Sequence, residues 1–170
     1  MVLGIYYLTQ ERPNSLGEGH YFKNLNEAIL AYENGYVKLH SRIHVRVTKK
    51  MADGTEKTGT VESTLGRFIF NEILPQDLGF VDRSIPENDL VLEVDFHVGK
   101  KGLKQILEKV INIHGATTTA EVLDDIKAMG YKYSTRAAMT VSISDMTVPE
   151  KKGEMLAAAQ ATVDKLSLIH

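Results

Sequence analysis

The chain has 170 residues, of which 43% are hydrophobic and 25% are charged, as is ordinary for one globular domain. Its formal charge of −2 argues against a generally basic nucleic-acid-binding protein, so any such role requires a local basic patch. The absence of cysteine excludes disulfides, thiolate nucleophiles and cysteine-ligated zinc, and it is consistent with a reducing cytoplasm.

The first ten residues, MVLGIYYLTQ, are apolar but have the features of neither a signal peptide nor a membrane span. They lack a basic leading region, and their apolar run is far below the ~20 residues that a membrane helix needs. An apolar first block without a polar lead-in suggests that the chain is a segment of a longer protein.

The next region predicts a loop followed by a short helix. Residues 13–19 contain Pro, Asn and two Gly residues and are typical of a loop. Asn24 or Asn26 then caps a short helix, and Gly35 lies where a C-terminal cap belongs. The apolar face of this helix comprises Leu25, Ala28, Ile29 and Tyr32.

Alternation between apolar and polar residues predicts a strand over Val37–Thr48. One face holds the apolar residues Val37, Leu39, Ile43, Val45 and Val47, with Ser41 as its only polar member. The other face holds Lys38, His40, Arg42, His44 and Arg46. Asp53-Gly54 is a hairpin turn signal, so Thr55–Val61 is predicted to return as a second strand.

The middle of the chain predicts a helix, a loop and a further strand. Helical spacing over 65–73 is followed by Pro75, and residues 76–88 are typical of a loop. Residues 90–98 then alternate between apolar and polar side chains, which predicts a strand. The alternating apolar residues are Leu90, Leu92, Val94, Phe96 and Val98.

The next segment predicts two helices and a last strand. Leu103, Ile106, Leu107, Val110 and Ile111 form one helical stripe. Gly115 is expected to end that helix, and Thr118 with Glu121 has the spacing of a capping box for a second one. Gly130 is expected to end the second helix, and Met139, Val141 and Ile143 are expected to form a strand.

The final residues have the spacing of a two-helix coiled coil, with apolar residues three and four positions apart at Leu156, Ala159, Val163 and Leu166. Such a stripe needs a partner helix. We therefore expect an α+β fold of short antiparallel strands with several helices and a protruding C-terminal helix, half of a coiled-coil hairpin. The expected domains are 1–148 and 149–170.

The Lys38–Arg46 face is the best candidate for contact with phosphates, through Lys38, His40, Arg42 and Arg46. The alternative is an ordinary solvated outer face of a sheet. His40 and His44 cannot share a metal, because four residues along a strand separate their Cα atoms by roughly 13 Å. Lys132 and Arg136 are further candidates for an anion contact, although cations near a helix end often only balance its dipole.

The sequence shows no catalytic constellation and no metal-binding set. Residues 17–19, GEG, fail as a phosphate loop, because the position that would complete the motif is Phe22. There is also no P-loop, no nucleophile elbow and no Ser/His/Asp pattern. No catalytic residue and no cofactor is therefore predicted from the residues alone.

Four blocks occur in the same order as in one protein family. They are MVLGIYYLT at 1–9, VKLHSRIHVRV at 37–47, TLGRFIFNEILP at 64–75 and LDDIKAMGYKYSTRAAMTVSISDMTVPEKK at 123–152. Together they resemble the pore region of the largest catalytic subunit, β′, of bacterial DNA-directed RNA polymerase. The resemblance implies a role in transcription within a cytoplasmic, DNA-binding nucleotidyltransferase.

The resemblance also implies that the chain alone is inactive. In that family three aspartates, in the sequence Asp-Phe-Asp-Gly-Asp, hold the catalytic magnesium, and this loop is absent here. The matching region of the family lines the secondary channel, through which nucleotides enter and the 3′ end of backtracked RNA leaves. Expected partners are the other polymerase subunits, nucleoside triphosphates and the RNA 3′ end.

Pro149–Leu166 resembles the first helix of the family's channel rim, where secondary-channel transcription factors dock. Its candidate docking residues are Glu150, Lys151, Lys152 and Glu154. From the residue pattern alone, the alternative function is a free-standing scaffold or nucleic-acid-binding module whose C-terminal helix recruits a partner.

Overall fold

The computed structural model describes the backbone of residues 1–147, and the exposure of side chains through residue 142. The predicted coiled-coil seam and rim residues Glu150, Lys151, Lys152 and Glu154 lie outside the described residues. The predicted division at residue 148 stays a prediction. Within the chain two compact units are distinguished, one of Thr9–His97 and one that joins Met1–Leu8 to the segment beginning at Val98.

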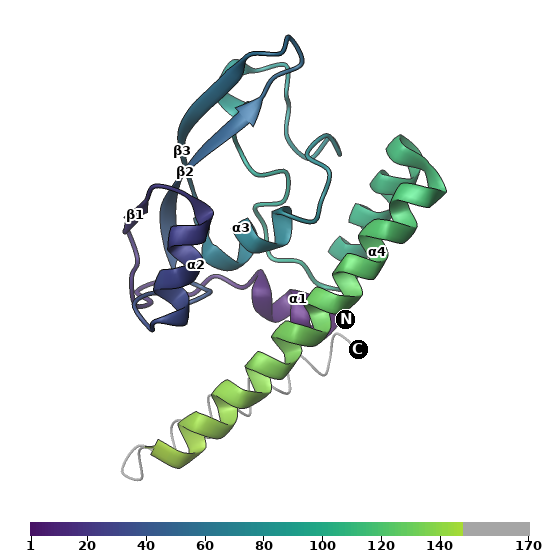
Figure 1. Ribbon diagram of the computed structural model, residues 1–170. Helices are drawn as coiled ribbons and strands as arrows, with labels where there is room; N and C mark the ends of the chain where they lie inside the picture. The colour runs from purple at the N-terminus through teal and green to yellow at the C-terminus, as the bar shows by residue number, and fades with distance from the viewer. Residues whose placement is uncertain (148–170) are drawn as a thin grey trace. The chain divides into compact units, whose positions relative to one another are not determined.

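The expected α+β class is confirmed (Figure 1). In chain order the elements are α1 (Val2–Leu8), β1 (Tyr21–Phe22), α2 (Leu25–Glu33), β2 (Arg42–Lys50), β3 (Glu56–Thr64), α3 (Leu65–Asn71), the 3-10 turn η1 (Pro86–Asn88) and α4 (Lys100–Thr147). The Thr9–His97 unit contains the sheet, and the other unit is helical where it is described. Among the described residues, none of the helices combines the length and hydrophobicity needed to span a bilayer.

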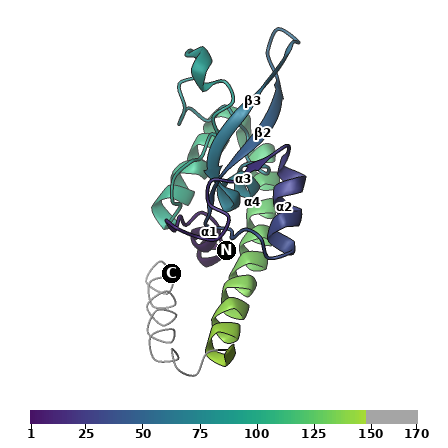
Figure 2. The same cartoon turned by 90° about the vertical axis from the view of Figure 1, so that its left-hand side faces the viewer.

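The sheet has the order β1-β2-β3, and the predicted hairpin forms its larger part. β2 and β3 are antiparallel with Arg42 opposite Thr64, whereas β1 is parallel to β2 with Tyr21 opposite His44. Gly54 supplies the turn with φ 87°, a conformation that glycine adopts without steric cost. The tip of the hairpin extends beyond α2 and α3 in both views (Figure 2).

The predicted start of the first strand, Val37, is wrong. Residues 38–41 form a turn, in which the Ser41 N–H donates to the Lys38 carbonyl oxygen at 3.2 Å. The Ser41 hydroxyl also donates to the Leu16 carbonyl oxygen at 2.6 Å. These bonds from Ser41 to backbone carbonyl oxygens outside the sheet take the place of strand pairing, so the ladder begins at Arg42.

Two short helices pack near one face of the sheet and bury its apolar side chains. Asn24, one of the two predicted caps, begins α2 by accepting from the Glu27 N–H at 2.8 Å. Thr64 caps α3 in the same way through Arg67 N–H. The core of this unit includes Ala28, Ile43, Val45, Leu65 and Phe70, all with no exposed surface.

The strand predicted over residues 90–98 is wrong. Its backbone pairs with side chains instead: Asn71 Nδ2 donates to the Val94 carbonyl oxygen at 2.7 Å, and Asn71 Oδ1 accepts from the Val94 N–H at 3.0 Å. The alternation also fails, because Glu93 and Val94 are both buried. The Glu93 carboxylate accepts from the N–H groups of Leu78 and Val81 at 2.8 and 3.0 Å.

In the helical unit, α4 contains a break at Gly115, where φ is 83° and ψ is 179°. The predicted end of the first helix at Gly115 is therefore confirmed, and helical arms run over 100–114 and 116–147. The first arm buries Leu103, Ile106 and Val110.

The predicted end of the second helix at Gly130, and the strand after it, are wrong. The helix passes through Gly130, and its buried stripe continues from Val122 and Ile126 to Tyr133 and Ala137. A Cβ at Gly130 would lie 2.5 Å from the Met1 carbonyl oxygen. Gly130 thus admits the backbone at the start of α1, which explains a glycine inside a helix.

Candidate nucleic-acid interface

The side of the sheet opposite the core forms a polar surface, which we call the outer sheet face. Antiparallel partners lie on the same face of a sheet, so β2 and β3 contribute to it at every second position. Its paired members are Arg42 and Thr64, His44 and Glu62, Arg46 and Thr60, Thr48 and Thr58, and Lys50 and Glu56. From Arg46 to the tip, all of these side chains are exposed.

At the end of this face that lies away from the hairpin tip, an ion-pair network is centred on Arg42, the first residue of β2. Arg42 Nη1 contacts Glu11 Oε1 at 2.7 Å, its Nε contacts Glu62 Oε1 at 3.2 Å, and its Nη2 contacts Asp95 Oδ2 at 3.6 Å. Arg67, which is 7% exposed, contacts the same Glu11 and Asp95 carboxylates at 3.4 Å. Arg42 therefore contacts three carboxylates, and Arg67 contacts two of the same three.

This network changes what Arg42 can do. Burial alone would lower the pKa of Arg42, but the hydrogen bond with Glu11 and the charges of Asp95, Glu11 and Glu62 together raise that pKa above its ordinary value. The guanidinium is permanently charged, and its charge is offset by its neighbours. Arg42 therefore contributes little to an attractive potential for phosphates.

Arg46 differs from Arg42, although it lies on the same strand and face. It is exposed, and among the described residues it has no ion pair within 4.0 Å. Its partner across the hairpin is the neutral Thr60. Of the predicted phosphate contacts on this strand, Arg46 is the one with an uncompensated charge.

An aromatic pair lies next to Arg46 on the outer sheet face. The rings of Tyr21 and His44 are stacked with centroids 4.1 Å apart and planes 7° apart. Tyr21 is 71% exposed. Its position was missed by sequence reasoning, because a two-residue parallel strand has no alternation of its own from which pairing with His44 could be inferred.

The structure separates the other predicted contacts. Lys38 is exposed but precedes the strand, and His40 is 5% exposed, so the prediction that both lie on the strand's polar face is wrong. Lys132 and Arg136 lie within α4, not between the predicted second helix and last strand, and Lys132 Nζ is 5.5 Å from the centre of the Tyr133 ring.

Within the described residues no group of three or more His, Asp or Glu side chains is placed to hold a metal.

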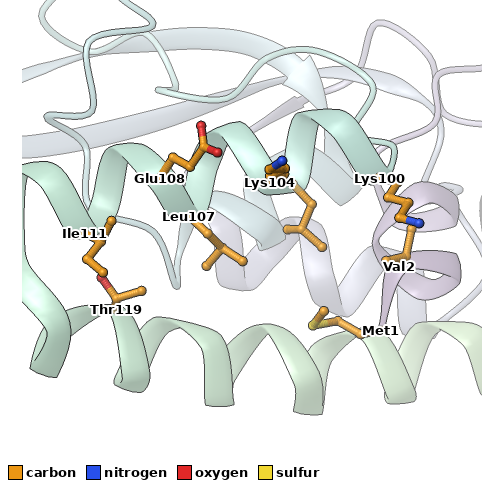
Figure 3. Close-up of a pocket in the computed structure, with 9 residues that line it drawn as sticks. Met1, Val2, Lys100, Lys104, Leu107, Glu108, Ile111 and Thr119 are labelled. Atoms are coloured by element: carbon orange, nitrogen blue, oxygen red, sulfur yellow. The ribbon is translucent and has the colours of Figure 1, made fainter.

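A groove of about 460 Å³ lies in the helical unit. Its apolar lining includes Leu103, Leu107 and Ile111 of the first α4 arm and Met1, the residue before α1. Ile111 lies beside Thr119 of the second arm (Figure 3). The side chains of Lys100, Lys104 and Glu108 also line the groove. This groove suits an apolar surface rather than a nucleotide.

Residues 1–146 match the family described as RNA polymerase Rpb1, domain 3. The chain belongs to this family. Over all 170 residues it is 65% identical to the DNA-directed RNA polymerase subunit beta' of Lachnoclostridium phytofermentans and 50% identical to that of Clostridium acetobutylicum, and it is 52% identical over 167 residues to that of Acetivibrio thermocellus. These alignments cover 98 to 100% of the chain and 14% of each relative.

Membership of the Rpb1 domain 3 family confirms the resemblance to the β′ subunit predicted from four sequence blocks. The related proteins are named as subunits of a DNA-directed RNA polymerase. The chain spans about one seventh of these relatives (14%), so it corresponds to a small part of each.

Proposed function

We propose that this chain is a non-catalytic part of a DNA-directed RNA polymerase β′ subunit, and that it forms part of the wall and rim of the secondary channel. The observation that carries this proposal is the match to Rpb1 domain 3 over residues 1–146, with β′ relatives aligned along nearly the whole chain. Nucleotides would enter through this channel, and the 3′ end of backtracked RNA would leave through it. The catalytic magnesium would be bound by aspartates outside this chain.

The partners in this proposal are the remaining polymerase subunits, nucleoside triphosphates, the RNA 3′ end and secondary-channel transcription factors. The chain's own contribution is electrostatic. Arg46 is exposed and uncompensated, so it raises the potential along a path taken by phosphates. Arg42 instead holds the Glu11, Glu62 and Asp95 carboxylates in place.

The test compares two arginines in the intact polymerase. Arg46→Gln should raise the KM for nucleoside triphosphates about two- to threefold, which is the effect expected for one charge roughly 7 Å from a phosphate in water. The effect should shrink as salt is raised, because exposed charges are screened. Arg12→Gln is the matched control, since Arg12 is also exposed but lies in a loop.

Unchanged KM and unchanged recovery from backtracking in Arg46→Gln would contradict the electrostatic role. Equal effects of Arg46→Gln and Arg12→Gln would indicate a general loss of positive charge rather than a contact made by the outer sheet face.

A further inference from the structure

The rings of Tyr21 and His44 are stacked, and the tyrosine is open to solvent. β1 holds Tyr21 directly opposite His44, so the stack is fixed by backbone pairing on both residues. Tyr21 is 71% exposed, whereas His44 is partly covered. The tyrosine ring therefore presents an aromatic surface of defined orientation beside a sheet.

A cation and a hydroxyl group lie next along the same face. Arg46 follows His44 by two residues, which places it roughly 7 Å further along the strand. Thr60 is its partner on β3. Glu62, the acidic residue opposite His44, has its charge offset by Arg42 at 3.2 Å.

This arrangement has the chemistry of a site for one nucleotide. Every base has a π-face that stacks on an exposed aromatic ring regardless of sequence, and a nearby guanidinium contacts the phosphate. A protein surface covering Tyr21 would need apolar area around it, but the side chains that flank His44 on this face, Arg46 and Glu62, are exposed and charged.

We propose that Tyr21, supported by His44, stacks against one unpaired nucleobase while Arg46 contacts the phosphate of the same nucleotide. This inference rests on the proposed function, and it adds a base contact to the electrostatic role of Arg46. The ligand chemistry is that of a nucleotide with an unpaired base, which either a free nucleoside triphosphate or the 3′ segment of displaced RNA would supply.

The experiment uses intact polymerase carrying Tyr21→Leu or Tyr21→Phe. Leucine keeps an apolar side chain of similar size but cannot stack, whereas phenylalanine can. One arm measures the KM for nucleoside triphosphates, and the other measures how long a complex holding extruded RNA stays backtracked. Tyr36→Leu is the matched control, since Tyr36 is 68% exposed and lies after α2, outside the sheet.

Tyr21→Leu should either raise the KM for nucleoside triphosphates about tenfold or shorten the lifetime of the backtracked complex about tenfold. Tyr21→Phe should stay close to the parent enzyme, and Tyr36→Leu should have no effect. The arm that changes identifies the source of the nucleotide. If Arg46→Gln changes either measurement but Tyr21→Leu changes neither, the stacking contact is overturned and the electrostatic role of Arg46 stands. If neither substitution changes either measurement, the stacking contact and the electrostatic role are both overturned. Loss of subunits from purified Tyr21→Ala polymerase, with tolerance of Tyr21→Leu, would overturn the proposal in favour of a protein partner.

Discussion

Two segments of this chain have the same alternation of apolar and polar residues, and only one of them is a strand. β2 alternates from Arg42 to Val47, and burial follows the pattern residue by residue. Residues 92–98 alternate in the same way, yet they form no strand, and Glu93 is buried beside Val94.

The difference lies in where the backbone hydrogen bonds go. In β2 they go to β3 across nine paired residues. In residues 90–98 those of Glu93 and Val94 go to amide side chains: Asn71 pairs with both backbone groups of Val94, and Gln76 Oε1 accepts from the Glu93 N–H at 2.9 Å. Alternation predicts which side chains turn inward only when a neighbouring strand enforces the extended backbone.

The largest expected effect is at Glu93. Glu93→Ala removes the acceptor for the N–H groups of Leu78 and Val81, and it leaves Arg83 Nη2, 3.7 Å away, without its counter-charge. The unfolding free energy should fall by about 3 kcal/mol, the lower end for a broken buried pair because Arg83 is partly exposed. Urea denaturation of the 170-residue chain measures it.

Glu87→Ala is the control for Glu93, because Glu87 is an exposed acid in the same loop. It should change the unfolding free energy by less than about 0.5 kcal/mol. Equal effects of the two substitutions would mean that residues 76–98 are not organised around the Glu93 carboxylate.

Asn71→Ala should have the next largest effect. It leaves the N–H and carbonyl oxygen of Val94, a fully buried residue, without hydrogen-bond partners. We expect a loss of about 2 to 3 kcal/mol, together with faster hydrogen exchange at the Val94 amide. Asn34→Ala, at the exposed end of α2, is the control and should leave that amide unchanged. Continued protection of the Val94 amide in Asn71→Ala would contradict the side-chain pairing.

A third test applies one change to an apolar position in each segment. Val45→Ala in β2 should cost about 2 kcal/mol, because a fully buried side chain loses two methyl groups and leaves a cavity. Leu92→Ala should cost less than about 1 kcal/mol, because Leu92 is only partly buried. Denaturation under the same conditions measures both. A larger loss at Leu92 would indicate that residues 90–98 pack as a strand does.

Features with local causes could be predicted from the sequence. The hairpin follows from Asp53-Gly54 between alternating segments, and the start of α2 follows from an asparagine before an amphipathic run. Arg46 was predicted as a phosphate contact from the same alternation. That role stays a prediction, but its exposed position on the polar face is confirmed.

Features with distant causes could not be predicted. Gly115 and Gly130 look equivalent in sequence, but Gly115 breaks a helix with φ 83°, and Gly130 lies inside one where Met1 approaches. Likewise, nothing in β2 indicates that Arg42 meets Glu11 and Asp95, which lie 31 and 53 residues away along the chain. Sequence spacing gives the face of a side chain, and the fold decides its partners.

The smallest expected effect concerns a turn that occurs once in each of the two regions. Asp53 in the hairpin accepts from the Thr55 hydroxyl and N–H at 2.6 and 3.0 Å, and Asp82 in the 76–98 loop accepts from the Ser84 hydroxyl and N–H at 2.5 and 3.0 Å. In both cases the hydroxyl hydrogen bond, aided by the backbone one, lowers the pKa of the aspartate below its ordinary value of 3.8.

Thr55→Val should therefore raise the pKa of Asp53 toward 3.8 and leave Asp82 unchanged, and Ser84→Ala should do the reverse. Because the folded-state pKa is depressed, the stabilisation is fully present above the unfolded-state pKa and is lost as pH falls through the folded-state pKa. NMR titration of the carboxyl carbons reads each aspartate separately. An unmoved Asp53 alongside a shifted Asp82 would mean that the hairpin turn, unlike the loop, does not depend on its hydroxyl hydrogen bond.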